Sequence, residues 1–364
     1  MSGSNAPSPH CSHSETCDVI GGGGGPAGAT AAAALARLGR SVVLVEKGRR
    51  RSRRVESAGP ALLTLLEAVG AKGRVETAGA LEPCSNVVLW VQSDSASAEK
   101  SRLLIDRDAF DRAMLQTAAE AGVKILKPAS AGRPRRDSDG WWVIPVRTPQ
   151  AGVGVKARFC VDAGGRTSLF PGLRTELAPR TLTLLADWTG DGRLCGEIRT
   201  EAGCQEWYWG GSRRNGTASM AVFVDAKRCI GVSRPMLSSL YRSLLARSKL
   251  LASWTKGRMA SGVAVQDATT SISRSLVGDR WCRAGDAAFT GVDHGRSAWL
   301  GNRSRVHHVR HRRDHRTTEW HDHDCGPDLH GFATVDRPPA HSRGVASACE
   351  SCDSFLVPLD ALAG

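Results

Sequence analysis

Apolar runs alternate with helical patterns through the first part of the chain, and this order predicts an α/β fold. Residues 18–47 read as a strand, a glycine-rich turn, an Ala-rich helix over residues 29–38 and a second strand that ends in Glu46. A strand, a helix and a second strand in this order are typical of a βαβ unit. The rest of the chain is interpreted around this unit.

Apolar positions at helical spacing predict three further helices. The first follows the Gly59–Pro60 turn and is stopped by Gly70, the second spans residues 108–121 with Asp108 as its cap, and the third spans residues 235–251. Shorter apolar runs predict strands at residues 87–92, 103–105, 123–126, 141–146, 156–161, 182–189, 218–224 and 278–288, among which 141–146 and 156–161 form a pair.

The glycine-rich turn has the spacing of a dinucleotide-binding fingerprint. In the register Gly23-x-Gly25-x-x-Gly28, the first glycine permits a tight turn and the second lets the backbone approach a pyrophosphate. The third, Gly28, lets the helix pack closely on the sheet. The helix would then point its N-terminal N–H groups at the phosphates. A second register, which uses Gly22, Gly24 and residue 27, stays open.

Four more residues belong to the same predicted site. Pro26 and Ala27 lie inside the turn, and Glu46 ends the second strand, where its carboxylate can accept hydrogen bonds from ribose hydroxyls. Lys47 follows directly and is predicted to lie beside the cofactor. It also begins a basic cluster that continues through Arg49–Arg51, Arg53 and Arg54. We interpret the cluster as a solvated loop, with attraction of an anionic substrate or partner as the alternative.

The composition of the chain limits the classes of function that we expect for it. The chain has 364 residues and a formal net charge of +13. No apolar run approaches the roughly 20 residues of a membrane helix. Residues 1–16 are polar and lack the apolar segment of a secretory signal, so we expect a disordered leader and a cytoplasmic protein. The basic residues follow no amphipathic helix with interleaved aromatics, and we expect neither nucleic acid nor a membrane as a partner.

The cysteines give no clear site. All eleven are scattered, and in this setting we predict reduced thiols. Cys349-x-x-Cys352 is a close pair, but no second pair supports a metal or redox site. His321, His323 and Cys325 also lie close together without the spacing of four metal ligands, which leaves a metal-binding tail as a weak alternative.

Three motifs stand in a characteristic order: the fingerprint ending at Glu46, DAGGRTS at residues 162–168 and AGDAAF at residues 284–289. This order resembles the FAD-dependent monooxygenase superfamily with the para-hydroxybenzoate hydroxylase fold. Residues 55–60 resemble the GESxPP stretch of its flavin-dependent halogenase and geranylgeranyl reductase branch, with valine where glycine is usual. Residues 105–111 resemble its hDRxxFD segment. The likeness covers residues 18–293.

The resemblance implies FAD as the cofactor and assigns further residues to it. Arg107 would reach the flavin nucleotide. Asp162 would lie beside the adenosine and ribityl end, and Gly285 with Asp286 beside the ribityl and pyrophosphate region. Each Asp–Gly turn taken alone could be purely structural. Their joint occurrence after a fingerprint favours the FAD interpretation.

The same resemblance implies an α/β architecture in which a Rossmann-like FAD-binding domain carries an inserted, mixed β-sheet substrate domain. The predicted segments are 17–85, 101–175 and 276–293 for the FAD-binding domain, 86–100 and 176–275 for the substrate domain, and 294–364 for an irregular tail. The family has a DPxxxxG segment after GDAA, whereas this chain has Asp293 followed by His294 and no helical pattern. The aperiodic ending, rich in His and Arg, is what a frameshifted or degenerate reading frame produces.

The leading hypothesis for the reaction is hydroxylation of an aromatic or other small organic substrate. The resemblance implies reduced FAD that forms a C4a-hydroperoxide with O₂, and NAD(P)H or a partner flavin reductase as the electron source. Trp207 and Trp209 are candidates for the substrate face, with core packing as the alternative. No side chain is assigned a catalytic role.

Two other hypotheses remain. In a flavin-dependent halogenase a lysine relays hypohalous acid, and Lys72 lies in a plausible region, but its flanks identify nothing. The Trp-Tyr-Trp at residues 207–209 also lacks the Ile-Pro of the halogenase motif. The unusual tail favours the other alternative, an inactive FAD-binding remnant.

Overall fold

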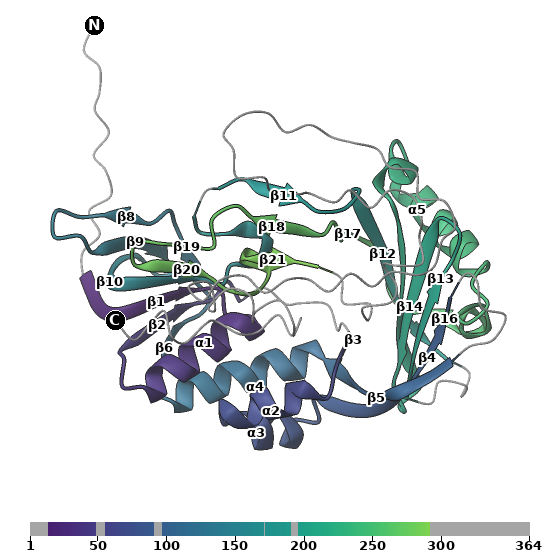
Figure 1. The fold of residues 1–364 in the computed structure, drawn as a ribbon, viewed down its shortest axis with the longest axis horizontal. Coiled ribbons are helices and arrows are strands. Elements are labelled where there is room, and N and C mark those ends of the chain that lie inside the picture. The colour runs from purple at the N-terminus through teal and green to yellow at the C-terminus, as the bar shows by residue number, and fades with distance from the viewer. Residues whose placement is uncertain (1–13, 49–54, 91–96, 171, 191–195, 292–364) are drawn as a thin grey trace, which may run out of the picture. The chain divides into compact units, whose positions relative to one another are not determined.

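The computed structural model describes residues 14–48, 55–90, 97–170, 172–190 and 196–291. All of these residues fall within one compact unit. Its described part contains two nine-stranded sheets and one three-stranded sheet (Figure 1). The helices are α1 (Pro26–Arg37), α2 (Ala61–Ala68), α3 (Lys72–Thr77), α4 (Arg107–Glu120) and α5 (Arg234–Leu245), with short 3₁₀ turns η1 (Gly165–Thr167), η2 (Ala226–Cys229), η3 (Ala252–Lys256) and η4 (Gly285–Ala287).

The first sheet has a parallel centre in the order β20-β10-β1-β2-β6. Its strands are β1 (Ser14–Gly22), β2 (Val42–Val45), β6 (Lys124–Leu126), β7 (Ser130–Ala131), β8 (Arg135–Arg136), β9 (Trp142–Arg147), β10 (Gly152–Asp162), β19 (Val277–Gly278) and β20 (Trp281–Arg283). Every residue of β2 is buried, as a strand covered on both faces requires. The antiparallel pairing of β9 with β10 confirms the predicted strand pair.

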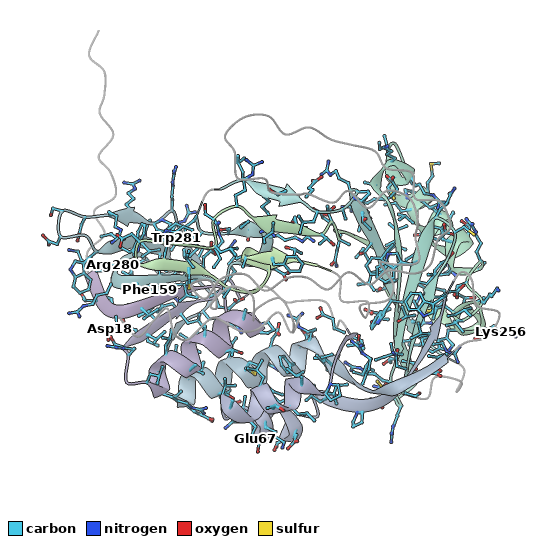
Figure 2. All side chains as sticks on the ribbon, viewed as in Figure 1. Asp18, Glu67, Phe159, Lys256, Arg280 and Trp281 are labelled. Carbon is cyan, nitrogen blue, oxygen red and sulfur yellow. The ribbon has the colours of Figure 1, made fainter. Side chains whose placement is uncertain are left out.

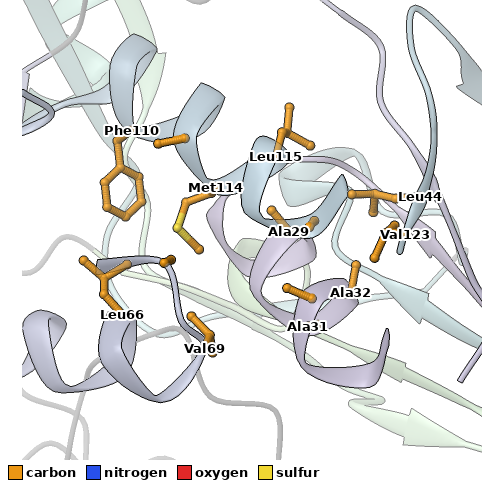
Figure 3. Close-up of a cluster of buried hydrophobic side chains, with 14 of the residues drawn as sticks. Ala29, Ala31, Ala32, Leu44, Leu66, Val69, Phe110, Met114, Leu115 and Val123 are labelled. Atoms are coloured by element: carbon orange, nitrogen blue, oxygen red, sulfur yellow. The ribbon is translucent and has the colours of Figure 1, made fainter. Parts of the chain in front are cut away.

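Helix α1 packs on this sheet through alanines. Ala29, Ala31 and Ala32 lie among Leu44 of β2 and Leu115 of α4 in one buried cluster (Figure 3). Small side chains let the helix approach the strands closely, and the larger side chains of α2 and α4 fill the remaining space. The Ala-rich pattern of the sequence therefore sets the position of the α1 N-terminus above the sheet.

The second sheet is mixed, because β13 pairs with β4 in parallel and the other described pairings are antiparallel. Its strands are β3 (Val55–Ala58), β4 (Leu81–Leu89), β5 (Ser97–Asp106), β12 (Thr181–Thr189), β13 (Glu197–Ala202), β14 (Glu206–Ser212), β15 (Thr217–Asp225), β16 (Arg258–Met259) and β17 (Ala264–Asp267). The small third sheet contains β11 (Arg174–Glu176), β18 (Ser271–Ser273) and β21 (Phe289–Thr290). The predicted α/β fold with a mixed second sheet is confirmed.

Several boundaries differ from the sequence prediction. Strands β3, β4 and β5 pair within the second sheet, although residues 55–58, 81–85 and 101–106 were expected in the FAD-binding part. These three strands belong to the second sheet because β4 pairs in parallel with the distant strand β13. Local sequence patterns do not predict such a long-range pairing. Strand β1 begins at Ser14 and so includes the end of the expected leader.

Two helix ends also differ from prediction. Helix α4 is capped by Asp106, whose side chain accepts from the Ala109 N–H at 3.0 Å, while Asp108 lies in the first turn. Helix α5 ends at Leu245 and does not continue to residue 251. The buried Glu201 carboxylate accepts hydrogen bonds from the Ser248 hydroxyl at 2.6 Å and the Leu250 N–H at 2.9 Å, which turns the chain away from a helical path.

Candidate functional site

The glycine turn after β1 adopts the first of the two predicted registers. Gly23 has φ +107°, a left-handed conformation that favours glycine. A Cβ added at Gly28 would overlap the carbonyl oxygen of Gly23. Gly25 is the N-cap of α1 and Pro26 is its first residue. The tight turn, the helix start and the close contact therefore fall on residues 23, 25 and 28, and Gly22 remains in β1.

The N-terminus of α1 is open to an anion. Its N-cap residue is a glycine, which has no side chain that could cap the helix. Its first turn contains no acidic residue. The first N–H groups of a helix lack partners within the helix and carry a partial positive charge. A phosphate at this position would satisfy these donors without displacing a protein group.

Glu46 ties the second strand to the glycine turn. Its Oε2 accepts from the Gly24 N–H at 2.6 Å, and its Oε1 accepts from the Gly48 N–H at 3.2 Å. A carboxylate offers about four acceptor positions, so both contacts leave capacity for ribose hydroxyls. Lys47 is exposed next to it. The predicted position of the acid at the end of β2 thus agrees with a ribose site.

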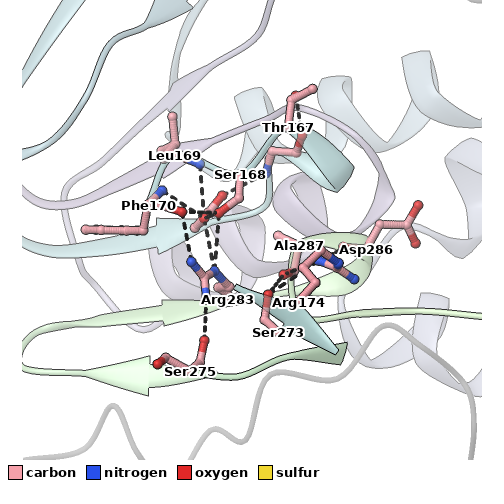
Figure 4. Close-up of polar contacts among 12 residues, drawn as sticks. Thr167, Ser168, Leu169, Phe170, Arg174, Ser273, Ser275, Arg283, Asp286 and Ala287 are labelled. Carbon is pink, nitrogen blue, oxygen red and sulfur yellow. Dashed lines mark hydrogen bonds and ion pairs between the residues drawn. The ribbon is translucent and has the colours of Figure 1, made fainter. Parts of the chain in front are cut away.

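The Asp162 side chain is directed into the turn that follows β10. Its side chain is fully buried, and it accepts from the N–H groups of Gly164, Leu169 and Phe170 at 3.2, 3.1 and 3.4 Å (Figure 4). The Ser168 hydroxyl also donates to it. The carboxylate is therefore occupied by the turn after β10, and its predicted contact with the cofactor stays a prediction; in the structure Asp162 has a role in the turn itself. That role is to fix the backbone beside Gly23.

Arg283 completes this turn and was not predicted. Its guanidinium lies 3.5 Å from Asp162 Oδ2, and the two side chains are 2% and 0% exposed. It also donates to the carbonyl oxygen of Phe170 at 2.9 Å and to that of Ser275. A buried cation needs such partners to offset its lost hydration. An arginine inside the apolar run of β20 was the available signal in the sequence.

The second Gly–Asp turn lies against the first. Gly285 has φ +59°, and a Cβ at this residue would lie 2.7 Å from Cβ of Ala27. Arg174 donates to the carbonyl oxygens of Asp286 and Ala287 at 3.2 and 3.1 Å, and so holds η4 in place. The Asp286 side chain points away from this arginine (Figure 4). The motifs at residues 23–28 and 284–289 are thus in contact.

The pKa of the Asp286 carboxyl is raised. The group keeps solvent access but is surrounded by protein on most sides, and this desolvation is the main cause. The Glu56 carboxylate acts in the same direction, while Arg166, Arg107 and Arg174 oppose it. The start of α4, strand β3 and the η4 turn are therefore close enough for their charges to interact.

Arg107 is held by two carboxylates. Its Nη1 donates to Glu56 at 2.6 Å, and its Nε and Nη2 donate to the two oxygens of Asp111 at 3.2 Å each. Burial opposes its charge, but Glu56 and Asp111 outweigh burial and raise its pKa. The guanidinium stays charged, and its remaining N–H groups can serve an anionic nucleotide.

The second sheet presents two different faces. Side chains of one face pack against α5, namely Leu184, Ala186, Trp188, Tyr208, Met220, Val222 and Val224. Side chains of the opposite face form a separate cluster, here called the aromatic face: Leu185, Trp207, Trp209, Ala221, Phe223 and Ala268. The Trp207 and Phe223 rings are stacked, with centroids 3.5 Å apart and planes 6° apart. Strand alternation thus separates Tyr208 from its two tryptophan neighbours.

Segments of the candidate FAD site border the aromatic face on two sides. Trp209 packs against the cluster that contains Val55, which precedes Glu56, the partner of Arg107. Ala268 belongs to the aromatic face, and the carbonyl oxygen of the next residue, Thr269, accepts from Arg166 Nη2 at 3.2 Å. Arg166 is part of the DAGGRTS motif.

Residues 15–172 match the family model described as FAD binding domain. This part of the chain is an FAD-binding domain. The match confirms FAD as the cofactor and confirms the predicted resemblance to FAD-dependent monooxygenases and halogenases. The open α1 N-terminus and the tight glycine contacts of the FAD-binding domain fit a pyrophosphate, in agreement with this assignment.

Known relatives of the FAD-binding domain carry out different reactions. Digeranylgeranylglycerophospholipid reductase 1 of Methanothermobacter thermautotrophicus is 25% identical over 209 residues, which are 55% of this chain and 51% of that protein. The structure of the peptidyl tryptophan dihydroxylase QhpG is 28% identical, with a TM-score of 0.64 over 79% of this chain and 64% of QhpG. The myxobacterial chondrochloren halogenase CndH has a TM-score of 0.70 at 19% identity, over 79% of this chain and 72% of CndH.

These comparisons show what the chain is similar to, namely FAD-binding oxidoreductases. The chain spans about half the length of the curated relative and less than two thirds of QhpG. A reductase, a hydroxylase and a halogenase all match it, so the FAD-binding fold is what they share.

The other features predicted from the sequence add little to the candidate site. Lys72 lies 3.5 Å from Glu67, and Glu67 projects from α2 into solvent (Figure 2). The described residues contain no group of three possible ligands that could hold a metal ion. In the same part of the chain, no helix is long and apolar enough to cross a membrane. The basic cluster at residues 49–54, the pair Cys349 and Cys352, the His321 group and the tail from residue 294 lie outside the described residues.

Proposed function

We propose that the protein is an FAD-dependent monooxygenase that hydroxylates an aromatic substrate. The observation that carries this proposal is the aromatic face, which the Arg107–Glu56 and Arg166–Thr269 contacts border on two sides. A planar substrate laid against Trp209 would lie between segments that belong to the FAD motifs. The substrate ring would gain contact area with the protein, and water would be excluded from the ring at the same time.

In this proposal each group of residues has one task at the cofactor. Gly23, Gly25, Pro26, Ala27 and Gly28 shape the turn that would hold the pyrophosphate. Glu46 and Lys47 would hold the adenosine ribose. Arg107, Gly285 and Asp286 would hold the ribityl and pyrophosphate region, while Asp162 and Arg174 fix the backbone from behind.

Bound FAD would supply the electron transfer and the oxygen chemistry. The chain's own residues would then bind and orient the substrate and keep water from the reacting atoms. The stack of Trp207 on Phe223 covers one face of each ring and makes the wall rigid. Trp209, which packs against Ile198 and Leu104, would offer the flat contact.

Halogenation has less support. The candidate Lys72 lies near Glu67 on the outer side of the helices, and it has no described contact with the FAD-binding motifs. QhpG acts on peptidyl tryptophan, as its description states, and it is more similar in sequence than the halogenase CndH. An aromatic side chain or a small aromatic molecule is therefore the substrate class that we prefer.

The purified full-length chain tests this function. We expect a yellow protein, or one that takes up added FAD, whose flavin absorbance is bleached by NAD(P)H or by a flavin reductase and returns in air. Addition of an aromatic compound should then yield a product heavier by one oxygen atom. A protein that binds no FAD would overturn the whole proposal. Stable FAD binding with no reduction by NAD(P)H, a reductase or dithionite would identify an inactive remnant.

A further inference from the structure

We propose that Asp187, oriented by Ser219, accepts a hydrogen bond from an O–H or N–H group on the aromatic substrate. This inference rests on the proposed function and names a specificity-determining residue for it. Asp187 lies on β12 between Ala186 and Trp188, which face α5, so strand alternation directs its side chain to the aromatic face. Its carboxylate is half-buried there.

Ser219 fixes the direction of this carboxylate. Its hydroxyl donates to Asp187 Oδ1 at 2.6 Å, and its side chain is almost completely buried. The two residues are directly opposite each other on β12 and β15. In the described part of the chain no arginine or lysine pairs with Asp187, and Ser219 is the side chain that donates to it. Among the described side chains, none donates to Oδ2, which can accept from a further donor.

The pair lies next to the ring of Trp209. Ser219 is opposite Gly211 on β14. A Cβ added at Gly211 would lie 2.8 Å from Cη2 of Trp209, so the six-membered part of the indole lies over this glycine. Asp187, Ser219 and the Trp209 ring thus follow one another across three adjacent strands. A substrate ring placed against Trp209 would bring its edge toward the carboxylate.

The chemistry favours a donor on the substrate over a purely structural role. A carboxylate without a cationic partner loses hydration when an apolar ligand covers it, and a donor on that ligand restores the lost hydrogen bond. A site built in this way rejects analogues that lack the donor, because the acceptor is then left unpaired. The predicted substrate class is therefore an aromatic ring that carries a hydroxyl or an N–H group.

Pairs of matched probes test the inference with the FAD-loaded, full-length protein. Indole with 1-methylindole, and phenol with anisole, differ in the donor while keeping the same ring. Binding is measured from the perturbation of the flavin absorbance spectrum. We expect the donor-bearing member of each pair to bind about tenfold more tightly, as a hydrogen bond to a charged group implies. Asp187→Leu should abolish this preference, Asp187→Asn should reduce it, and Ser219→Ala should give an intermediate result.

Asp139→Asn serves as the matched control, since Asp139 is exposed in a turn of the first sheet, and it should keep the preference. Equal binding of both members by the wild-type protein, or an unchanged preference in Asp187→Leu, would overturn the inference but leave the aromatic substrate class intact. If no probe perturbs the flavin of the wild-type protein, the inference and the aromatic substrate class both fail. A protein without flavin would show instead that the proposed function itself is wrong.

Discussion

The carbonyl oxygen of Gly23 occupies the space that a side chain at Gly28 would need. The two residues lie at opposite ends of the glycine turn, and their contact brings the first turn of α1 against the end of β1. Gly23 takes φ +107° to make this approach possible. Ala163, which directly follows strand β10, borders both glycines. The turn is therefore shaped by contacts between backbones.

Replacement of Gly28 by alanine should weaken FAD binding by tenfold or more, on the order of 1.4 kcal/mol. The new Cβ would overlap a backbone atom, so either the α1 N-terminus or Gly23 must move from its place. Titration with FAD, followed by flavin fluorescence, measures the effect. Gly73→Ala is the control, because a Cβ at this α3 residue meets no atom within 4 Å. Wild-type affinity in Gly28→Ala would show that the contact is not needed.

Removal of one partner from the buried pair of Asp162 and Arg283 should strongly destabilise the protein. Arg283→Met removes the cation and leaves a fully buried carboxylate, and such losses cost about 3–5 kcal/mol of unfolding free energy. Asp162→Asn combined with Arg283→Met should recover part of the loss, since no unpaired charge remains. Urea unfolding of the three proteins measures this.

A surface pair provides the comparison for Arg283. Arg214 is 75% exposed where it meets Glu82, so Arg214→Met should cost no more than about 1 kcal/mol. If Arg283→Met lowered the free energy of unfolding as little as Arg214→Met, the buried pair would not be needed to stabilise the turn.

Local sequence patterns predicted the first βαβ unit and two possible registers of its glycines, and the resemblance to a known family predicted FAD. These features depend on neighbouring residues: Gly23 and Gly28 are five positions apart, and Glu46 ends the next strand. The mixed second sheet was also expected. Its membership was not, because β4 joins β13 across more than a hundred residues and no local pattern records that pairing.

The surroundings of single residues depend on distant partners in the same way. Asp162 ends strand β10 and Asp286 lies shortly after β20, each beside a glycine-containing turn, yet one is fully buried and the other keeps solvent access. The difference comes from Arg283 and the turn at residues 168–170, which enclose Asp162. Whether a carboxylate faces a ligand or its own backbone is decided by such distant partners, and the motif alone does not show it.

Asp286→Asn should stabilise the FAD-free protein at neutral pH while weakening FAD binding. The pKa of Asp286 is raised in the folded state, so the folded protein holds this proton more tightly than the unfolded chain. The group therefore favours folding below its unfolded pKa of about 3.9, and this contribution is lost as the pH rises through the folded pKa. Amide replacement removes the cost of the charge.

Thermal unfolding at pH 3 and pH 7 tests this sign. The gain from Asp286→Asn should appear at pH 7 and vanish at pH 3, where the native carboxyl is protonated in both states. Asp106 gives the opposite case, because its pKa is lowered by the N-cap contact with Ala109 and by Arg213, which outweigh burial. Asp106→Asn should destabilise the protein at pH 7 and have a smaller effect at pH 3, because this contribution is lost as the pH falls through the lowered folded pKa. Equal effects of Asp286→Asn at both pH values would contradict the assignment.

Trp209 should contribute to substrate binding without contributing to FAD binding. Trp209→Leu keeps an apolar side chain but removes the flat ring, and aromatic contacts of this kind add about 0.5–1.5 kcal/mol, which corresponds to a roughly twofold to tenfold rise in KM for an aromatic substrate. The FAD affinity should stay at the wild-type value, because Trp209 contacts Ile198 and Leu104 and lies apart from the glycine turn.

The neighbouring residue on the strand supplies the control for Trp209. Tyr208 faces α5 and donates to Glu206 at 2.8 Å, so Tyr208→Phe should lower stability slightly and leave KM unchanged. Opposite effects of two adjacent substitutions would follow from strand alternation alone, since only one of the two side chains belongs to the aromatic face. If Tyr208→Phe changed KM as much as Trp209→Leu, or if Trp209→Leu released FAD, the substrate would have to bind elsewhere, and the aromatic face would be part of the packed core.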